Sequence, residues 1–373
     1  MTTRKPNLGV FTSKPKSRIT RSRYKHISER GAEQGLNVYL FSPRDVHEDH
    51  VRGYVFEDGE WKAYDCPLPD VVYDRIFTKR PDQAKQAKDT RNYLRSLNAV
   101  FINDPAVAVY CRDKLKFAQT MEEHDVNHPE TVKYTERNAT KMSKKHRTAY
   151  FKPRTGSAGT GIIIARQIGR NRYSLSYKKN ENREWVSKRI QAPGSELPNA
   201  VDFIRHDELG LRDRYIVQEG LDLLKYDDSQ TDFRIVTMRN GDNEQKIAGC
   251  FSRVDGNFHQ GGKILDFKEV TDGLNGGSQQ NGRRMRRKIR RGAIKAVGAL
   301  ENITDDGSIG EAGIDLVVEK SGDEYVIEGN SKPGPMFLDI ARLYPDTAIA
   351  RKAKRQRRRA ADSLVGYALY LAA

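Results

Sequence analysis

The feature that most constrains the fold is an acidic segment at residues 313–334. Two apolar runs flank the turn-prone residues 320–323, a pattern that predicts a β-hairpin. The first strand carries Asp315, and the second ends in Glu328 and Asn330. Because a hairpin places its strands side by side, we expect two carboxylates and one amide oxygen to converge, which are hard ligands suited to Mg²⁺. Taken alone, the segment is equally consistent with a solvated acidic turn.

The size and composition of the chain narrow the classes of protein. A length of 373 residues is enough for two or three domains. No apolar run approaches the roughly 18 residues of a membrane span, and the first residues lack the apolar core of a signal peptide. Cys66, Cys111 and Cys250 lie far apart, which argues against a zinc site or a disulfide framework. We therefore expect a cytoplasmic protein.

The alternation of apolar patterns predicts an α/β and α+β protein. Strands and helices alternate over residues 1–108, as in a small α/β domain with a parallel sheet. Residues 109–218 are rich in strand patterns and form a first α+β unit. Residues 219–373 form a second, which contains the acidic hairpin and two long helices, over about 283–301 and 346–371.

A glycine-rich loop is the second strong signal. Lys152 ends a predicted strand and is followed by Arg154, Gly156, Gly159 and Gly161, after which a β-branched strand resumes. Glycines let backbone N–H groups approach an anion closely, so the loop suits phosphate. It is not a Walker A loop, because no Lys-Ser/Thr follows and a strand stands where a helix is needed. An ordinary glycine-rich hairpin is the alternative, but the two cations favour phosphate binding.

Weaker signals follow further along the chain. Residues 215–222 read as an apolar strand that runs into a polar hinge, where exposed backbone could contact adenine and Asp222 a ribose hydroxyl. The same pattern suits a core strand and turn equally well. Asp232 and Arg234 are two apart and therefore share one face of a strand, and Arg253 follows them. Each of these features alone is more often a solvated strand face.

The order of these motifs resembles the ATP-grasp superfamily. The motifs are Lys-Pro-x-x-Gly-x-x-Gly-x-Gly, Gln-Glu-Gly, Asp-x-Arg, Gly-Ile-Asp and Glu-x-Asn-Ser-x-Pro-Gly. The detail is most similar to the YheC/YheD-like branch, described as endospore coat-associated, at 217–221, 313–316, 330–334 and 367–371. The resemblance covers roughly residue 104 to the C-terminus. The resemblance implies that an ATP-grasp fold of two α+β subdomains follows the N-terminal α/β domain in the chain.

The resemblance also implies roles for individual residues, with ATP bound between the two subdomains. The residues expected to bind ATP are Lys114, Lys152, Gly156, Ser157, Gly159, Gly161, Gln218, Glu219, Leu221 and Asp222. Lys116 is the alternative to Lys114 as the first lysine that contacts the phosphates. One or two Mg²⁺, or Mn²⁺ instead, would be held by Asp315, Glu328 and Asn330. Two positions depart from the family pattern: Gly329 and Asp222 stand where apolar residues, or proline at the second, are common.

The implied activity is that of a carboxylate–amine ligase. A substrate carboxylate attacks the γ-phosphate to give an acyl phosphate, and an amine then displaces phosphate to form an amide. Arg234, Arg253 and Lys152 would stabilise the charge that develops, so catalysis needs alignment and electrostatics rather than a nucleophilic side chain. The substrates would be amino acids or acidic peptides. The alternatives are a kinase of the same fold and a non-catalytic ATP-binding or anion-binding coat protein.

The formal net charge of +16 indicates affinity for anions. Much of the excess lies in two basic segments, 283–291 and 351–359. An apolar stripe that begins at Met285 and Ile289 predicts a helix with its arginines in solvent, and a simple solvated face is the favoured interpretation. The alternatives are recruitment of an acidic peptide or polymer, and binding to nucleic acid or a spore-type anionic surface. The sequence does not specify the substrates or the oligomeric state.

Overall fold

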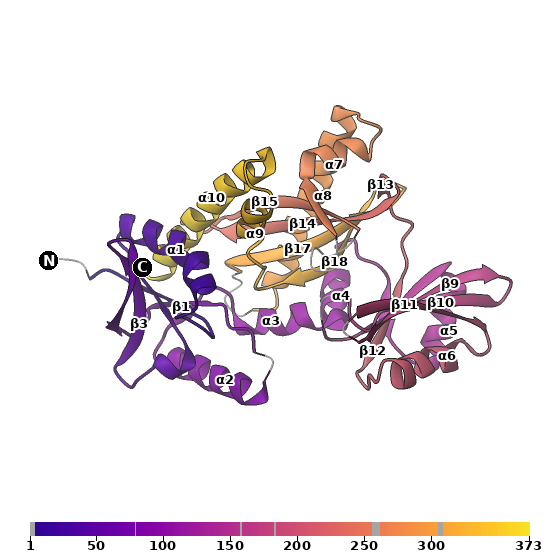
Figure 1. Ribbon diagram of the computed structural model, residues 1–373, viewed down its shortest axis with the longest axis horizontal. Coiled ribbons are helices and arrows are strands. Elements are labelled where there is room, and N and C mark those ends of the chain that lie inside the picture. The colour runs from indigo at the N-terminus through magenta and orange to yellow at the C-terminus, as the bar shows by residue number, and fades with distance from the viewer. Residues whose placement is uncertain (1–3, 79, 157–158, 183, 256–261, 305–308) are drawn as a thin grey trace.

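Three β-sheets lie in a row along the molecule, each covered by helices (Figure 1). The computed structural model describes the chain except residues 1–3, 79, 157–158, 183, 256–261 and 305–308. The predicted α/β and α+β class is confirmed. Within the described residues, no helix is both long and apolar enough to cross a membrane.

The N-terminal sheet has the strand order β4-β3-β2-β1-β5-β6. Its parallel strands are β1 (Asn7–Phe11), β2 (Asn37–Phe41), β5 (Val71–Asp74) and β6 (Val100–Phe101). An antiparallel hairpin, β3 (His50–Glu57) and β4 (Glu60–Pro67), extends one edge. The accompanying helices are α1 (Arg18–Glu33) and α2 (Pro81–Ser96). Strands β1 and β5 are buried along their whole length, as expected of parallel strands covered on both faces.

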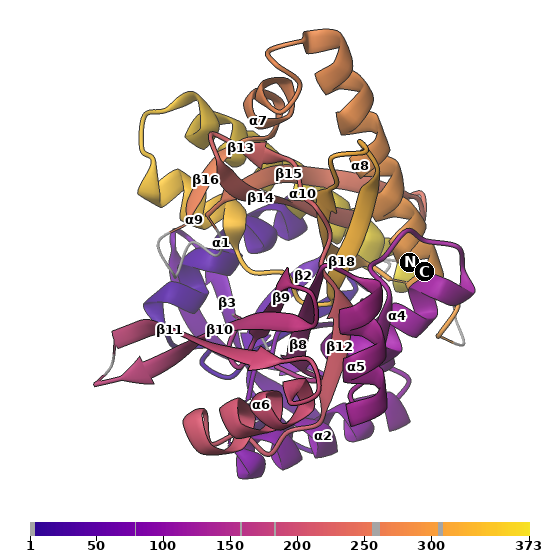
Figure 2. The same ribbon diagram turned by 90° about the vertical axis from the view of Figure 1, so that its right-hand side faces the viewer.

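The second sheet in chain order lies at the far end of the row, so that the third sheet stands between it and the N-terminal sheet (Figure 1). It has the order β11-β10-β9-β8-β12-β7 and is antiparallel throughout. Its strands are β7 (Thr131–Lys133), β8 (Thr148–Pro153), β9 (Ile163–Gly169), β10 (Arg172–Glu181), β11 (Glu184–Pro193) and β12 (Tyr215–Glu219). Helices α5 (Glu136–Lys145) and α6 (Leu197–Phe203) belong to this sheet, whereas the preceding helices α3 (Pro105–Arg112) and α4 (Lys114–Glu123) bury apolar residues in the core of the third sheet. Figure 2 faces this part of the molecule and shows α5 and α6 beside the sheet. Their apolar residues share one core with β8, β9 and β12.

The third sheet has the order β16-β15-β14-β17-β18, with β13 paired to β14. The strands are β13 (Lys225–Tyr226), β14 (Ser229–Arg239), β15 (Gln245–Val254), β16 (Lys263–Asp266), β17 (Glu311–Val318) and β18 (Glu324–Asn330). The predicted hairpin is therefore confirmed as β17 and β18. Phe233 and Ile235 of β14 pack toward α8, whereas Val236 packs toward the opposite helices, because side chains alternate along a strand.

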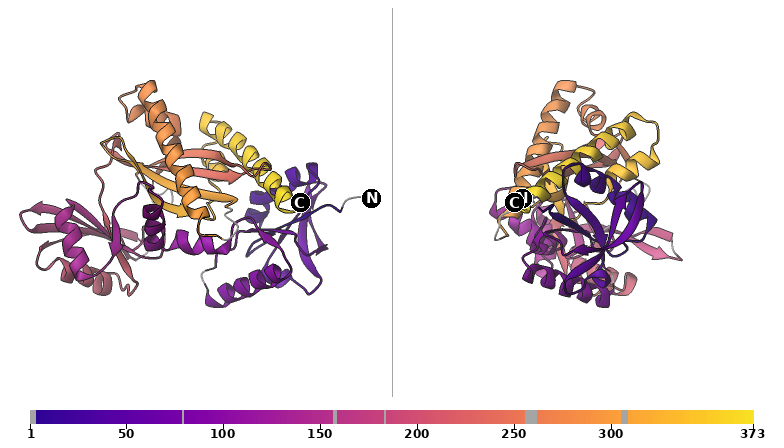
Figure 3. Two further views of the ribbon diagram at one scale, coloured as in Figure 1. Left: turned by 180° about the vertical axis from the view of Figure 1, so that it is seen from behind. Right: turned by 90° about the vertical axis from the view of Figure 1, so that its left-hand side faces the viewer.

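Besides α3 and α4, the helices of the described chain that flank this sheet are α7 (Phe267–Gly273), α8 (Gln279–Glu301), α9 (Met336–Leu343) and α10 (Ala348–Leu371). The stripe of α8 that includes Met285 and Ile289 is buried, as predicted. The helix begins four residues earlier than expected, because the Ser278 side chain caps it by accepting a hydrogen bond from the Asn281 N–H. Helix α10 leads from the third sheet back to α1 at the N-terminal sheet (Figure 3).

Helix α10 joins the two ends of the chain into one core. Leu364, Val365 and Tyr367 share a buried cluster with Leu8 and Val10 of the N-terminal sheet. The last helix thus packs on the first domain as well as on the third sheet, although it is distant from the first domain in sequence. The domain boundaries near residues 108 and 218 stay predictions.

Candidate functional site

The acidic hairpin brings its carboxylates together. The register of β17 and β18 pairs Asp315 with Glu328 and Gly313 with Asn330. Glu328 and Asn330 are two apart and so lie on one face of β18. The side chain of Asn330 directs its amide nitrogen to the Gly313 carbonyl at 3.4 Å, which leaves the amide oxygen as a metal-binding atom. The register thus brings Asp315 and Glu328 side by side, as expected of a hairpin, and their binding of a metal stays a prediction.

Two arginines reach this acidic pair across neighbouring strands. Arg234 of β14 lies opposite Asp315 and holds both of its oxygens, with Nη2 2.6 Å from Oδ2. Arg253 of β15 contacts Asp232 through Nε and donates from Nη2 to Asp315 at 2.9 Å. Burial alone would raise the pKa of Asp315, but the two guanidinium groups outweigh burial and lower it. Asp315 is therefore an anion in this network.

Glu328 is in the opposite electrostatic situation. Burial and then the neighbouring charge of Asp315 raise its pKa, and Arg234 and Lys114 only partly offset them. A divalent cation would relieve both effects, and the carboxylates of Asp315 and Glu328 with the Asn330 amide suit Mg²⁺. No group of three or more His, Cys, Asp and Glu side chains that could hold a metal occurs in the described part of the chain. Glu328 and the Asn330 amide fit a half-shell that waters or phosphates would complete, and Asp315 would join it by giving up contacts with Arg234 and Arg253.

Two lysines approach the acidic pair: Lys152 from β8 of the second sheet, and Lys114 from the start of α4. The Nζ of Lys152, on β8, donates to Gln218 Oε1 of the adjacent strand β12 at 2.5 Å. Gln218 in turn donates to Thr131 Oγ1 of β7 at 2.9 Å, which fixes its orientation. The pKa of Lys152 is lowered to about 8, chiefly by burial and also by the positive charge of Lys114, while Glu328 acts in the opposite direction. Both lysines thus sense the Glu328 carboxylate.

The structure favours Lys114 over Lys116 as the lysine beside the glycine loop. Lys114 Nζ donates to the Gly156 carbonyl at 2.8 Å, whereas Lys116 Nζ lies over the Tyr110 ring, 4.9 Å from its centre. At the start of the loop, Arg154 Nε is 2.7 Å from Asp113 Oδ1. This pair anchors the loop to the N-terminus of α4.

The glycines of the loop adopt a backbone that other residues rarely take. Gly156, Gly159 and Gly161 have φ of +121°, +70° and +76°. A Cβ on Gly161 would also lie 2.7 Å from the Leu211 side chain. The predicted contact of Ser157 lies outside the described residues.

The predicted adenine residues lie at the end of β12. Gln218 is buried and Leu221 half-buried. The Glu219 side chain accepts from the Glu130 N–H at 3.1 Å and lies 3.2 Å from His146 Nδ1, so it ties the hinge to β7 and α5. Asp222 is exposed and pairs with Lys320 at 3.0 Å. The expected ribose contact of Asp222 and the adenine contacts stay predictions.

Gly329, which departs from the family pattern, has a packing reason. A Cβ there would lie 2.7 Å from the Phe117 ring of α4 and 3.3 Å from Cys111 Sγ. The absent side chain lets α4, which begins with Lys114, sit directly against the strand that carries Glu328 and Asn330. The glycine therefore brings the lysine and the acidic hairpin close together.

Sequence reasoning missed an ionic junction between the N-terminal sheet and the site. Lys332 Nζ is 2.8 Å from Asp74 Oδ2, and Arg75 Nη1 is 2.6 Å from Glu311 Oε2. The junction holds the loop that directly follows Asn330. Partners more than 230 residues apart carry no local signal. One feature of the sequence could have indicated the junction. Asp74 and Arg75 lie at the carboxyl end of a predicted parallel strand, where binding sites often occur.

Comparison with known proteins identifies the family. A model of the YheC/D-like ATP-grasp family matches residues 103–371. The chain belongs to the YheC/D-like ATP-grasp family. Among curated proteins, endospore coat-associated protein YheD of Bacillus subtilis (strain 168) is 23% identical over 343 residues, which cover 86% of this chain and 69% of YheD.

Solved structures of ligases share the fold. D-cycloserine synthetase DcsG has a TM-score of 0.53 at 13% identity, over 95% of this chain and 99% of that protein. A RiPP-associated ATP-grasp ligase of Chryseobacterium gregarium, solved with ADP and a leader and core peptide, has a TM-score of 0.51 at 13% identity, over 96% of this chain and 97% of that one. These similarities confirm the predicted ATP-grasp fold of this family member, which resembles ligases.

Proposed function

We propose that this YheC/D-like protein is an ATP- and Mg²⁺-dependent ligase that joins a carboxylate to an amine. The observation that carries the proposal is the meeting of two opposed sets of charges. Lys152 approaches from β8 of the second sheet and Lys114 from the start of α4, whereas Asp315 and Glu328 belong to the third sheet, and they lie close enough for the lysines and Glu328 to perturb one another. Cations on one side and metal-binding carboxylates on the other suit a magnesium nucleotide between them.

The proposed roles follow from these positions. Lys114, Lys152 and the backbone of the glycine loop hold the phosphates, because ammonium groups and N–H groups attract phosphate oxygens. The hinge at Gln218 and Leu221 holds the adenine. Mg²⁺, or Mn²⁺, would be held by the acidic hairpin residues and would neutralise charge on the phosphates.

The reaction joins the two substrates in two balanced steps. A carboxylate oxygen of the first substrate bonds to the γ-phosphorus as the bond to ADP breaks. The amine nitrogen of the second substrate then bonds to the acyl carbon, phosphate leaves and the nitrogen gives up a proton to solvent. Arg234 and Arg253, buried against Asp315, are positioned cations that stabilise the oxygens on which negative charge develops.

The basic surface supports acidic peptides or amino acids as substrates. Arg283, Arg284, Arg287 and Arg291 of α8 are exposed, as are Lys354 and Arg355 of α10. The positive electrostatic potential of these exposed side chains raises the local concentration of anions. The same surface would serve association with a spore-type anionic layer or nucleic acid, and the curated relatives are described as endospore coat-associated.

The test measures phosphate release from ATP and Mg²⁺ with a panel of amino acids and acidic peptides, and the products by mass. The variant Glu328→Gln removes one metal-binding charge. Glu324→Gln, at the other end of the same strand, is the matched control. We expect release that needs a carboxylate and an amine together, with an amide product, lost in Glu328→Gln and kept in the control.

The other outcomes point to the alternatives. Transfer of phosphate to a hydroxyl group without an amide would identify a kinase. ATP binding with no stimulated turnover across the panel would favour a non-catalytic coat component. Absence of ATP binding would refute the proposed nucleotide site itself.

A further inference from the structure

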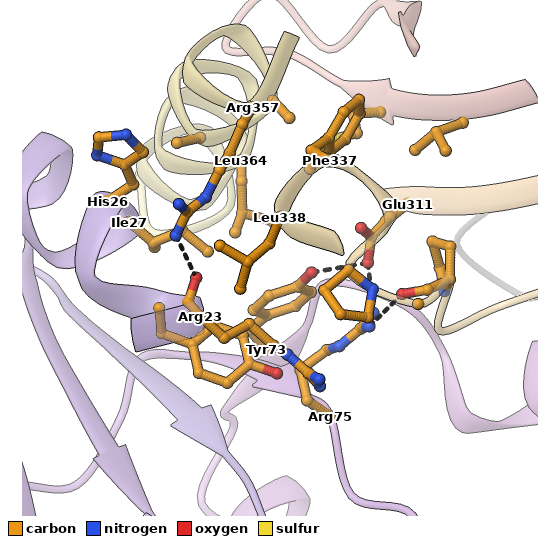
Figure 4. Close-up of a pocket in the computed structure, with 18 residues that line it drawn as sticks. Arg23, His26, Ile27, Tyr73, Arg75, Glu311, Phe337, Leu338, Arg357 and Leu364 are labelled. Carbon is orange, nitrogen blue, oxygen red and sulfur yellow. Dashed lines mark hydrogen bonds and ion pairs between the residues drawn. The ribbon is translucent and has the colours of Figure 1, made fainter. Parts of the chain in front are cut away.

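A cavity separate from the proposed nucleotide site lies where the two ends of the chain meet. It has a volume of about 80 Å³, is partly open to solvent, and lies between α1, the residues that follow β5, the start of α9 and α10 (Figure 4). None of the predicted site residues is among the described residues that line it.

The walls of the cavity are largely apolar and aromatic. Tyr24 of α1, Tyr73 of β5, Phe337 and Leu338 of α9 and Leu364 of α10 line it. These residues come from segments far apart in the chain, so the cavity exists only because α10 packs back on α1. Such a lining fits the body of a small apolar molecule.

The charged groups at the cavity are unbalanced. Three arginines line it: Arg23 from α1, Arg75 from the end of β5 and Arg357 from α10 (Figure 4). Glu311 is the single carboxylate among the described lining residues. It is already engaged by Arg75 at 2.6 Å and by the Tyr73 hydroxyl at 2.7 Å. Arg23 and Arg357 are therefore left without a carboxylate in the described lining.

Arg357 is a poorly compensated cation. Its Nη2 donates to the main-chain carbonyls of Ser22 at 2.8 Å and Arg23 at 3.2 Å, and no acidic side chain of the described chain lies within 4 Å of it. Burial lowers its pKa, and the carboxylate of Glu29 on α1 only partly opposes this. The Nε of Arg23 is also buried and has no hydrogen-bond partner within the described residues. Buried cations and N–H groups without partners cost free energy that a bound anion would recover.

We propose that this cavity binds a small apolar carboxylate, with its body between Tyr73, Phe337 and Leu364 and its carboxylate toward Arg23 and Arg357. A carboxylate accepts two hydrogen bonds from a guanidinium group, which suits this ligand class. The apolar walls exclude small hydrophilic anions, because they offer those anions no further polar partners.

The cavity is a subsite distinct from the reacting centre. Glu311 lies four residues before Asp315 on the same face of β17, which corresponds to about 13 Å along the strand. Pro333 and Gly334 line the cavity and lie in the loop that follows β18, which ends at Asn330. A bound ligand would therefore also restrict the motion of the end of β18 that is proposed to bind the metal. Binding itself needs neither ATP nor Mg²⁺.

The test titrates the full chain with 3-phenylpropionate, without ATP and Mg²⁺, by ligand-observed NMR and calorimetry. The uncharged 3-phenylpropionamide and acetate serve as matched probes that lack the charge and the apolar body. We expect saturable binding of 3-phenylpropionate, at least tenfold weaker binding of both other probes, and at least a tenfold loss in Arg357→Gln. Arg355→Gln, an exposed arginine of the same helix, should bind as the wild type does.

A second variant tests the cavity without removing charge. Ala361→Leu places extra side-chain atoms into the lining from α10 and should abolish binding while its melting temperature shows that the chain is folded. Three outcomes would each overturn the inference. They are equal affinity for 3-phenylpropionate and its amide, equal losses of affinity in Arg355→Gln and Arg357→Gln, and no binding of 3-phenylpropionate. Because ATP is absent from the titration, these outcomes are independent of the proposed ligase activity.

Discussion

Burial of Lys152 makes ATP binding dependent on pH. Burial lowers the pKa of this side chain from the ordinary 10.5 to about 8, so the free protein loses the charge in a mildly basic range. A phosphate beside the ammonium group favours the charged form and raises the pKa again in the complex. The proposed contact of Lys152 with ATP therefore predicts that affinity falls as the pH rises above about 8.

The magnitude follows from the fraction of charged lysine. With a pKa of about 8 in the free protein, about nine-tenths of the side chain is charged at pH 7 and about one-tenth at pH 9. If the bound lysine stays charged, the Kd for ATP rises about tenfold over this range, which is about 1.4 kcal/mol. The free energy of unfolding changes in the opposite sense. Between pH 8 and 10.5 the unfolded chain binds more protons at Lys152 than the folded chain does, so the contribution of this residue to the free energy of unfolding rises with pH.

The assay is calorimetric titration with ATP and Mg²⁺ from pH 7 to pH 9. Lys152→Gln should bind more weakly at pH 7 and lose most of the pH dependence. Lys116→Gln, which removes a lysine that lies over Tyr110, should keep the wild-type dependence. A wild-type Kd that is constant over this range, or a slope that survives in Lys152→Gln, would refute the reasoning.

Two further predictions concern packing and charge near the site. Gly329→Ala brings a Cβ to 2.7 Å from Phe117, so it should lower the free energy of unfolding, measured in urea, by about 1–3 kcal/mol. Gly298→Ala is the control, because this glycine of α8 faces open space. Its free energy of unfolding should be unchanged or raised by up to about 1 kcal/mol. Glu311→Ala leaves Arg75 buried without its carboxylate and should cost about 3–5 kcal/mol; a loss under 1 kcal/mol in the same urea experiment would show that the pair is solvated.

Local patterns in the sequence determined the elements that carry the chemistry. The acidic hairpin, the strand ending at Lys152 and the buried stripe of α8 each rest on contacts between near neighbours, whose spacing is visible in the chain. The order of motifs further predicted the ATP-grasp fold and family, which the comparisons bear out. Weak patterns failed: α5 was not predicted, because its buried face consists only of Ala139, Met142 and Ser143.

Only the tertiary structure decided which distant groups meet. It placed Lys114 rather than Lys116 at the glycine loop, since residues two apart on a helix point to nearly opposite sides and so meet different neighbours. It also paired Arg75 with Glu311 and created the cavity between α1 and α10. Such contacts depend on how whole sheets and helices pack, and burial rather than sequence spacing then sets the charge of each group. The sequence thus determined what each segment could form, and packing decided what the segments could do together.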